Sequence, residues 1–184
     1  MRKIKVKDIM VPLKDYATVH QDSFLSEAIL ALEKAQEEHD TRHYKHRAVL
    51  VYDDSKKIVG KLSQLDVIKS LEPKYKNFGN LTHASLSGFS LDFMRSMLDK
   101  HNLWQGDLET ICVRVANKKV KDAMYIPTEG EMVDVDATLG EALHAFIIGH
   151  HQGLLVTKNG DIVGILRLTD VFKLVDERIK SCKF

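Results

Sequence analysis

Apolar and polar positions along the chain predict the same order of structural elements twice. Each half begins with a short extended segment, continues with an amphipathic helix, passes through two β-rich runs and ends with a second helix. The extended segments and β-rich runs lie at 17–19, 48–52 and 58–62 in the first half and at 132–135, 154–157 and 162–166 in the second, and the closing helices are 65–71 and 168–178. The pattern therefore predicts two α/β repeats.

Local signals mark where these elements begin and turn. Thr138 with Glu141 three residues later forms a capping box, which predicts the start of the first helix in the second half. Asp22 or Ser23 is expected to cap the matching helix in the first half. Asn159–Gly160 lies between two β-rich runs and tolerates the positive φ angles of a tight hairpin turn.

Short motifs repeat in register with these elements. VKDIM at 6–10 returns as VKDAM at 120–124, at an offset of 114. The offset falls to 104 between GKLSQLD at 60–66 and GILRLTD at 164–170, so the first repeat holds ten residues more. Most of them belong to the polar stretch 33–46, which we expect to extend the first helix into solvent or against a partner. Internal duplication is typical of units that bury one another, and it favours a binding site between them.

The chain divides into a first repeat, an insertion and a second repeat, at 1–72, 73–119 and 120–184. Ser90 predicts the start of a helix in the insertion, and the apolar stripe at 91–98 is expected to pack on the protein's own core, with Trp104 anchoring the helix end. A strand is predicted at 111–115. The stretch 77–90, rich in Ser, Gly and Asn, is expected to be a mobile loop.

Composition narrows the class of protein. A chain of 184 residues with 44% hydrophobic and 29% charged residues can bury a sizeable core. The net charge of +1 favours neither nucleic acid nor an anionic membrane as a partner. The chain lacks an apolar run that could span a bilayer and a signal peptide, and its two cysteines suit a reducing compartment. We therefore expect a cytoplasmic protein without a disulfide framework.

The candidate ligand-binding residues lie where the last strand of each repeat ends and the following helix begins. The first turn of a helix offers unpaired N–H groups and a partial positive charge, which suit a phosphate. Ser63 could add a hydroxyl donor, and the carboxylate of Asp66 could accept both hydroxyls of a ribose. The same two residues also fit an ordinary helix cap, so a structural role is the alternative.

These motifs and their order resemble the CBS domains, named after cystathionine beta-synthase, whose tandem pairs form a Bateman module. The resemblance covers about 130 residues and leaves out the insertion. It implies two repeats packed as a pseudo-twofold pair, with two clefts that take an adenosine nucleotide (AMP, ADP or ATP) or a related adenosyl compound. It also implies a regulatory function without a catalytic residue, cofactor or metal.

The resemblance assigns residues to both clefts. In the first cleft Asp66 would hold the ribose, Ser63 would approach the phosphate, and the base and sugar would be framed by Thr18, Val19, Arg47 and Ala48. In the second cleft Asp170 matches Asp66, and the lining residues would be Met132, Val133, Gly153 and Leu154. Arg167 stands where the family favours serine or threonine, so it either binds a phosphate or fills the cleft. His151 is a further candidate for a phosphate contact.

Three functions remain open from the residues. The first is a ligand sensor that acts as a homodimer on an unidentified effector protein. The second is a ligand-free interaction module that docks a partner enzyme or transporter. The third is a metal-dependent enzyme that uses His39, His43 and His46, whose spacing could place them on one side of a helix. A solvated helix without a metal is the preferred explanation of this charged stretch, because it offers no obvious carboxylate or cysteine as a fourth ligand. We expect a sensor, because the chain lacks the GxSxG, GxxxxGK, HExxH and GxGxxG motifs.

Overall fold

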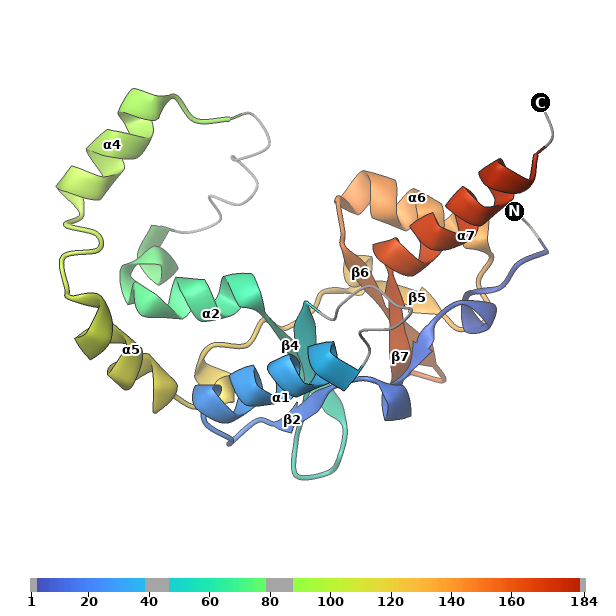
Figure 1. Ribbon diagram of the computed structural model, residues 1–184, viewed down its shortest axis with the longest axis horizontal. Coiled ribbons are helices and arrows are strands. Elements are labelled where there is room, and N and C mark those ends of the chain that lie inside the picture. The colour runs from blue at the N-terminus through green and yellow to red at the C-terminus, as the bar shows by residue number, and fades with distance from the viewer. Residues whose placement is uncertain (1–2, 39–46, 79–87, 183–184) are drawn as a thin grey trace.

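The protein folds into two α/β repeats whose sheets face each other, with a helical insertion beside the first repeat (Figure 1). The computed structural model describes residues 3–38, 47–78 and 88–182. The predicted histidine cluster lies outside these residues, as does most of the predicted loop at 77–90. The predicted α/β class with duplicated strand, helix, strand, strand, helix order is confirmed.

The first repeat is a three-stranded sheet covered by helices. Its elements are β2 (Thr18–His20), α1 (Leu25–Glu38), β3 (Ala48–Tyr52), β4 (Ile58–Ser63) and α2 (Gln64–Leu71). The strand order is β2-β3-β4, with β2 parallel and β4 antiparallel to β3. Because side chains alternate along a strand, Val49 and Val51 face the helices while Leu50 faces the other repeat.

The second repeat has the same elements and one additional strand. They are β5 (Met132–Asp134), α6 (Leu139–Gly149), β6 (Gly153–Lys158), β7 (Asp161–Arg167) and α7 (Leu168–Ser181). Here β1 (Val11–Pro12) pairs antiparallel with β7, so the strand order is β1-β7-β6-β5. Asn159 and Gly160 have φ of 53° and 89°, which gives β6 and β7 their two-residue hairpin turn.

The segments that lead into the two repeats exchange places. The N–H of Val6 donates to the carbonyl of Ala137 (2.9 Å), so the VKDIM segment packs on the second repeat. The N–H of Val120 donates to the carbonyl of Ser23 (2.9 Å), so the VKDAM segment packs on the first. Val6 and Val120 are fully buried. Each repeat is therefore completed in space by residues that precede the other in sequence.

Glycine is required where each exchanged segment crosses a sheet. A Cβ at Gly164 would lie 2.5 Å from the carbonyl oxygen of Val11, and one at Gly60 would lie 2.7 Å from Sδ of Met124. Real Cβ atoms do not approach a main-chain oxygen as closely as 2.5 Å, so a larger residue at Gly164 would push the segment away, whereas at Gly60 the Met124 side chain would have to move. The glycines of the repeated motif thus serve the packing of the leading segments.

The two repeats share a small core between their sheets. Leu50 from the first repeat packs with Tyr16, Leu155 and Ile165, all less than a tenth exposed. The larger cores lie on the opposite face of each sheet, beneath the helices. This arrangement places the ends of β4 and β7 beside each other, where α2 and α7 begin.

The helix caps agree with the sequence in the second repeat and differ in the first. Thr138 and Glu141 form the predicted capping box, with Glu141 accepting from the N–H of Thr138 (2.6 Å). In the first repeat the residue before α1 is Phe24 instead of the predicted Asp22 or Ser23. Its N–H donates to Glu27 (2.6 Å), but its side chain can accept nothing. Only one of the two capping bonds forms there.

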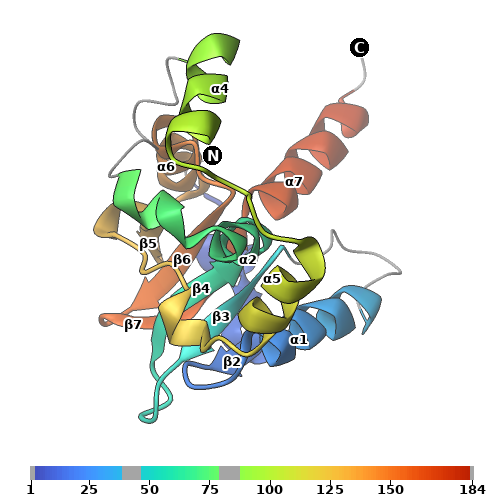
Figure 2. The ribbon, with the colours of Figure 1, turned by 90° about the vertical axis from the view of Figure 1, so that its left-hand side faces the viewer.

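The insertion contains two helices, α4 (Leu91–Lys100) and α5 (Leu108–Ala116). Ser90 caps α4 as predicted, since its Oγ accepts from the N–H of Phe93 (3.1 Å). The strand predicted at 111–115 was wrong. Asp107 caps a helix there, and Ile111 and Val115 pack one turn apart against the first repeat's core. Figure 2 shows this helix, α5, beside α1 and α2.

The apolar stripe of α4 does not pack on the protein's core, so this prediction was also wrong. Leu91 is 67% exposed and Met94 45%, and Figure 1 shows α4 standing apart from both sheets. Leu103 is the buried residue that follows α4. Trp104 is held at the surface, where its Nε1–H donates to the hydroxyl of Tyr75 (3.2 Å).

Candidate functional site

A cleft of about 150 Å³ lies between the repeats, at the open ends of the two hairpins and away from their turns. Both repeats contribute to its walls, and several of the contributing positions are equivalent by the repeat. The lining residues are Tyr16, Arg47, Ala48, Lys61, Ser63, His151, Gln152, Gly153, Ile165, Arg167 and Thr169. Ser63 and Arg167 are the paired residues just before α2 and α7, so the cleft lies close to the pseudo-twofold axis.

The charge of the cleft favours an anion. Arg47, Lys61 and Arg167 carry positive charges, and His151 adds an imidazole ring. None of the lining residues is acidic. The N-terminus of α2, which carries a partial positive charge, begins beside Ser63. Phosphate or carboxylate groups are the ligands that such a surface attracts.

Ser63 and Asp66 form the capping box of α2. Oδ2 of Asp66 accepts from the N–H of Ser63 (2.9 Å) and from its hydroxyl (2.6 Å). Oδ1 of Asp66 accepts no hydrogen bond from the described residues. The carboxylate therefore caps the helix with one oxygen and keeps the other available to a hydroxyl donor.

Arg167 and Asp170 occupy the equivalent positions in the second repeat, with a different geometry. Nε and Nη2 of Arg167 each lie 2.6 Å from one oxygen of Asp170. The guanidinium and the carboxylate are both largely buried, with side-chain exposures of 8% and 13%. Arg167 cannot accept from a helix N–H, and α7 has no side-chain cap. A bidentate ion pair thus replaces the capping box of the first repeat.

Lys61 is held in the cleft wall by a buried carboxylate. Nζ of Lys61 and the hydroxyl of Tyr125 both donate to Glu131, whose side chain is only 6% exposed. Burial opposes ionisation of Glu131, but the two donors more than offset it, so the pKa of this carboxyl lies below its usual value. The same hydrogen bond raises the pKa of Tyr125 to about 12. The three side chains join β4 to the segment that precedes β5.

Tyr16 closes the floor of the cleft. Burial raises the pKa of its hydroxyl to about 12, and the nearby Arg167 acts in the opposite direction. The tyrosine therefore stays protonated at neutral pH. Its ring packs on Leu50 and Ile165, which fixes the cleft to the core between the sheets.

The structure brings together six of the residues that the sequence assigned to a ligand site. Those that line the cleft are Arg47, Ala48, Ser63, His151, Gly153 and Arg167. Asp66 and Asp170 lie directly behind this wall, bonded to Ser63 and Arg167. The others, which do not line the cleft, are Thr18, Val19, Met132, Val133 and Leu154. Val19, Val133 and Leu154 are buried in the cores under the helices, so only their main chain could reach a ligand.

Sequence reasoning missed Lys61, Tyr16 and the carboxylate of Glu131. A signal for Lys61 was present, because it lies two residues before Ser63 on β4 and so points to the same face of the sheet. Tyr16 and Glu131 follow no periodic pattern. Their positions depend on long-range packing that the motif does not encode.

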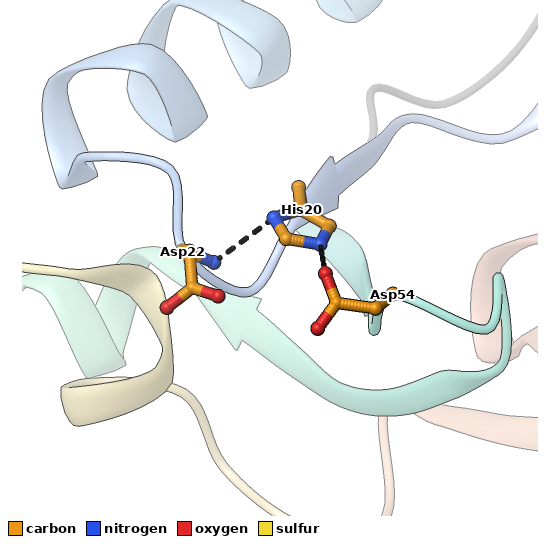
Figure 3. Close-up of side chains that lie close together, drawn as sticks. All are labelled: His20, Asp22 and Asp54. Carbon is orange, nitrogen blue, oxygen red and sulfur yellow. Dashed lines mark hydrogen bonds and ion pairs between the residues drawn. The ribbon is translucent and has the colours of Figure 1, made fainter.

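Three further side chains gather on the outer edge of the first repeat, away from the cleft (Figure 3). His20, Asp22 and Asp54 place potential metal ligands within 4.8 Å of one another. However, the N–H of Asp22 donates to Nδ1 of His20 (3.3 Å), so the ring proton lies on Nε2, which donates to Asp54 (3.1 Å). Lys121 pairs with Asp22 (2.6 Å). Both ring nitrogens of His20 and one carboxylate oxygen each of Asp22 and Asp54 therefore already have partners in the protein.

A second, open hollow lies between α1 and α2. Its walls are mostly apolar and include Ile29, Val67 and Ile68. Unlike the cleft between the repeats, it has no positive side chain among its lining residues.

Among the described residues, no helix is both long and apolar enough to cross a bilayer.

Solved structures share this fold across nearly the whole chain. A CBS domain-containing protein of unknown function from Bacillus anthracis aligns over 96% of both chains, with a TM-score of 0.63 and 19% identity. CBSX2 in complex with AMP covers 96% of this chain and 98% of its own, with a TM-score of 0.58 and 19% identity. The CBS domain of a bacterial CNNM/CorC family Mg²⁺ transporter in complex with ATP covers 95% and 89%, with a TM-score of 0.57 and 15% identity. No curated protein matches the chain.

The family comparison agrees with the repeats seen in the sequence and the structure. The CBS domain model matches twice, at residues 6–73 and 120–177, which leaves the insertion between the two matches. These segments contain both exchanged leading segments and both motifs at the cleft. The chain belongs to the CBS domain family, as a tandem pair.

Proposed function

We propose that this protein is a regulatory module that binds an adenosine nucleotide in the cleft between its repeats and signals through a change of conformation. The observation that carries the proposal is the convergence of Arg47, Lys61 and Arg167 on one cleft at the start of α2. The fold is shared with CBS-domain structures in complex with AMP and ATP, which supports a nucleotide as the anion. CBS domains are in general regulatory and not catalytic.

Each part of a nucleotide finds a chemical partner beside this cleft. The basic side chains and the hydroxyl of Ser63 suit a phosphate, and Oδ1 of Asp66 suits a ribose hydroxyl. The main chain near Thr18 and Ala48 would frame the base. These roles place the ligand against the first repeat, with its phosphate toward the second.

The size of the cleft connects binding to a signal. Its volume of about 150 Å³ is below the roughly 300–1,000 Å³ of ordinary small-molecule sites. A nucleotide therefore requires side chains to move or the repeats to separate. Lys61 would exchange Glu131 for a phosphate, and this would loosen the contact between β4 and the segment before β5. A ligand that binds the open state more tightly shifts the population toward it.

We further propose that the module is a cytoplasmic homodimer that acts on an effector protein. Apolar side chains are exposed on the outer helices of both repeats, among them Leu65 on α2 and Ile147 and Phe172 in the second repeat. Such faces are typical of contacts between copies or with a partner. The exposed stripe of α4 also favours the second candidate function, a docking module for a partner enzyme or transporter.

A thermal-shift and calorimetry panel tests the nucleotide proposal. AMP, ADP, ATP and S-adenosylmethionine are titrated, with inorganic phosphate as the reference for an anion alone. At 100 times Kd, binding adds about 2.7 kcal/mol to the free energy of unfolding, which raises the Tm of a chain this size by roughly 5–10 °C. No shift with any compound at millimolar concentration would leave the docking module as the better function.

A pair of variants separates ligand binding from helix capping. Asp66→Asn weakens the capping box of α2 and removes the proposed ribose acceptor. Glu141→Gln weakens the matching box of α6, which lies outside the cleft. Both variants should lose about 1 kcal/mol of stability. Only Asp66→Asn should lose nucleotide binding, and equal binding by both variants would assign Asp66 to capping alone.

A further inference from the structure

We propose that the chain binds one nucleotide, beside Asp66, and that Arg167 closes the equivalent position beside Asp170 to a second. The inference rests on the proposed function and concerns how many nucleotides the module takes. Duplication gives each repeat a carboxylate at the third position of a helix, bonded to a residue that lines the cleft. The two carboxylates differ in what already occupies their oxygens.

Asp66 keeps an acceptor available and Asp170 does not. The cap at α2 uses Oδ2 of Asp66, while Oδ1 accepts nothing from the described residues. Both oxygens of Asp170 accept from the guanidinium of Arg167 at 2.6 Å. A ribose hydroxyl that approached Asp170 would have to displace a charged donor that binds through two short parallel bonds.

Burial makes this displacement unfavourable. Arg167 is only 7% exposed, so a guanidinium that left Asp170 would need another partner inside the cleft. A ribose is neutral and cannot balance its charge. The guanidinium is planar and its fork matches a carboxylate, which holds the pair in one geometry. The guanidinium of Arg167 therefore binds the carboxylate of Asp170 in the place where the ribose of a second nucleotide would bind.

The same arginine contributes to the first site. Arg167 lines the cleft together with Ser63, and its positive charge is oriented by Asp170 from behind. The nucleotide beside Asp66 would meet this charge with its phosphate. The second repeat has arginine where the first has serine. This single difference would thus leave one nucleotide site in place of two equivalent ones, and it would give the remaining site an additional positive partner for the phosphate.

Replacement of Arg167 by the first repeat's residue tests the inference. Arg167→Ser frees both oxygens of Asp170 and supplies the capping hydroxyl that α7 lacks, so the variant is expected to fold. Arg178→Ser removes an exposed arginine from the same helix and is the matched control. The readout is the number of nucleotides bound per chain, measured by equilibrium dialysis with labelled AMP, ADP and ATP up to millimolar concentration.

The expected stoichiometry is one for the wild-type chain and for Arg178→Ser, and two for Arg167→Ser, with the first site several-fold weaker. In Asp66→Asn it should be zero, and in the Asp66→Asn/Arg167→Ser double variant it should be one. Two nucleotides on the wild-type chain would overturn the inference and leave the proposed function standing, as would one or none on Arg167→Ser. No binding by the wild-type chain would overturn the proposed function itself.

Discussion

Removal of the charge on Glu131 should weaken the whole fold, because this carboxylate joins the two repeats from a buried position. Glu131→Gln leaves the side chain's shape unchanged but leaves Nζ of Lys61, whose side chain is 22% exposed, without a counter-charge. The loss of one partner of a buried ion pair costs about 3–5 kcal/mol. A glutamine can still accept one hydrogen bond from Lys61 or Tyr125, so we expect about 3 kcal/mol, at the low end of that range.

A double-mutant cycle separates the pair from its surroundings. Lys61→Met alone leaves Glu131 buried without its ammonium partner and should also cost about 3 kcal/mol. Removal of both charges leaves no unpaired ion, so the double variant should lose much less than the sum of the two. The coupling free energy is then at least about 2 kcal/mol. The measurement is urea unfolding at pH 7, followed by circular dichroism.

Two comparisons can refute this reasoning. Asp176→Asn removes an exposed pair on α7, where Lys180 lies 2.7 Å away, and should cost only about 0.5 kcal/mol. A similar small loss for Glu131→Gln, or a coupling below about 0.5 kcal/mol, would mean that the buried carboxylate does not stabilise the fold. The pH dependence is a second check. Because the folded-state pKa of Glu131 is lowered, its contribution is present at neutral pH and is lost on acidification, and Glu131→Gln should lack this acid-dependent part.

Three other predictions follow from single positions. Gly164→Ala should cost about 1–3 kcal/mol in chemical unfolding, because its Cβ meets the carbonyl of Val11, whereas Gly140→Ala in α6, with nearest contact at 3.7 Å, should be neutral or stabilising. Tyr16 has its folded-state pKa raised to about 12, so it stabilises the fold below pH 10 and this contribution, about 3 kcal/mol, is lost as the pH rises from 10 to 12. Tyr16→Phe should flatten that part of a pH–stability curve. Met94→Ser should change the free energy of unfolding by less than about 0.5 kcal/mol, and a larger loss would mean that α4 packs on the core after all.

The fold was predictable because each local pattern in one repeat occurs again in the other, so the two copies support the same assignment. Strands β3, β4, β6 and β7 carry apolar runs, and their positions agree with the prediction to within a residue or two. The insertion has no second copy, and there the prediction at 111–115 failed. Ile111, Cys112 and Val113 favour a strand by composition, but the Asp107 cap and the burial of Ile111 and Val115 one turn apart decide for a helix.

The candidate site was only partly predictable because the sequence does not report which side chains bind each other. The motif located Ser63 and Arg167, and both line the cleft. The pattern could not decide between a phosphate contact and a filled cleft for Arg167, because that depends on the distance to Asp170. Glu131 is also invisible in the pattern, since it lies far from Lys61 in sequence and meets it only when the repeats assemble.

The exchange of leading segments determines when each repeat can complete its fold during synthesis on the ribosome. Val11 pairs with Ile165, which is made 154 residues later, and the first repeat needs Val120 before its own core is closed. At about 5–20 residues per second, the first strand waits for roughly 8–30 seconds with its edge unpaired. The first repeat therefore cannot close its core until the segment with Val120 has been made, and residues 11–12 stay without their strand partner until β7 has been made.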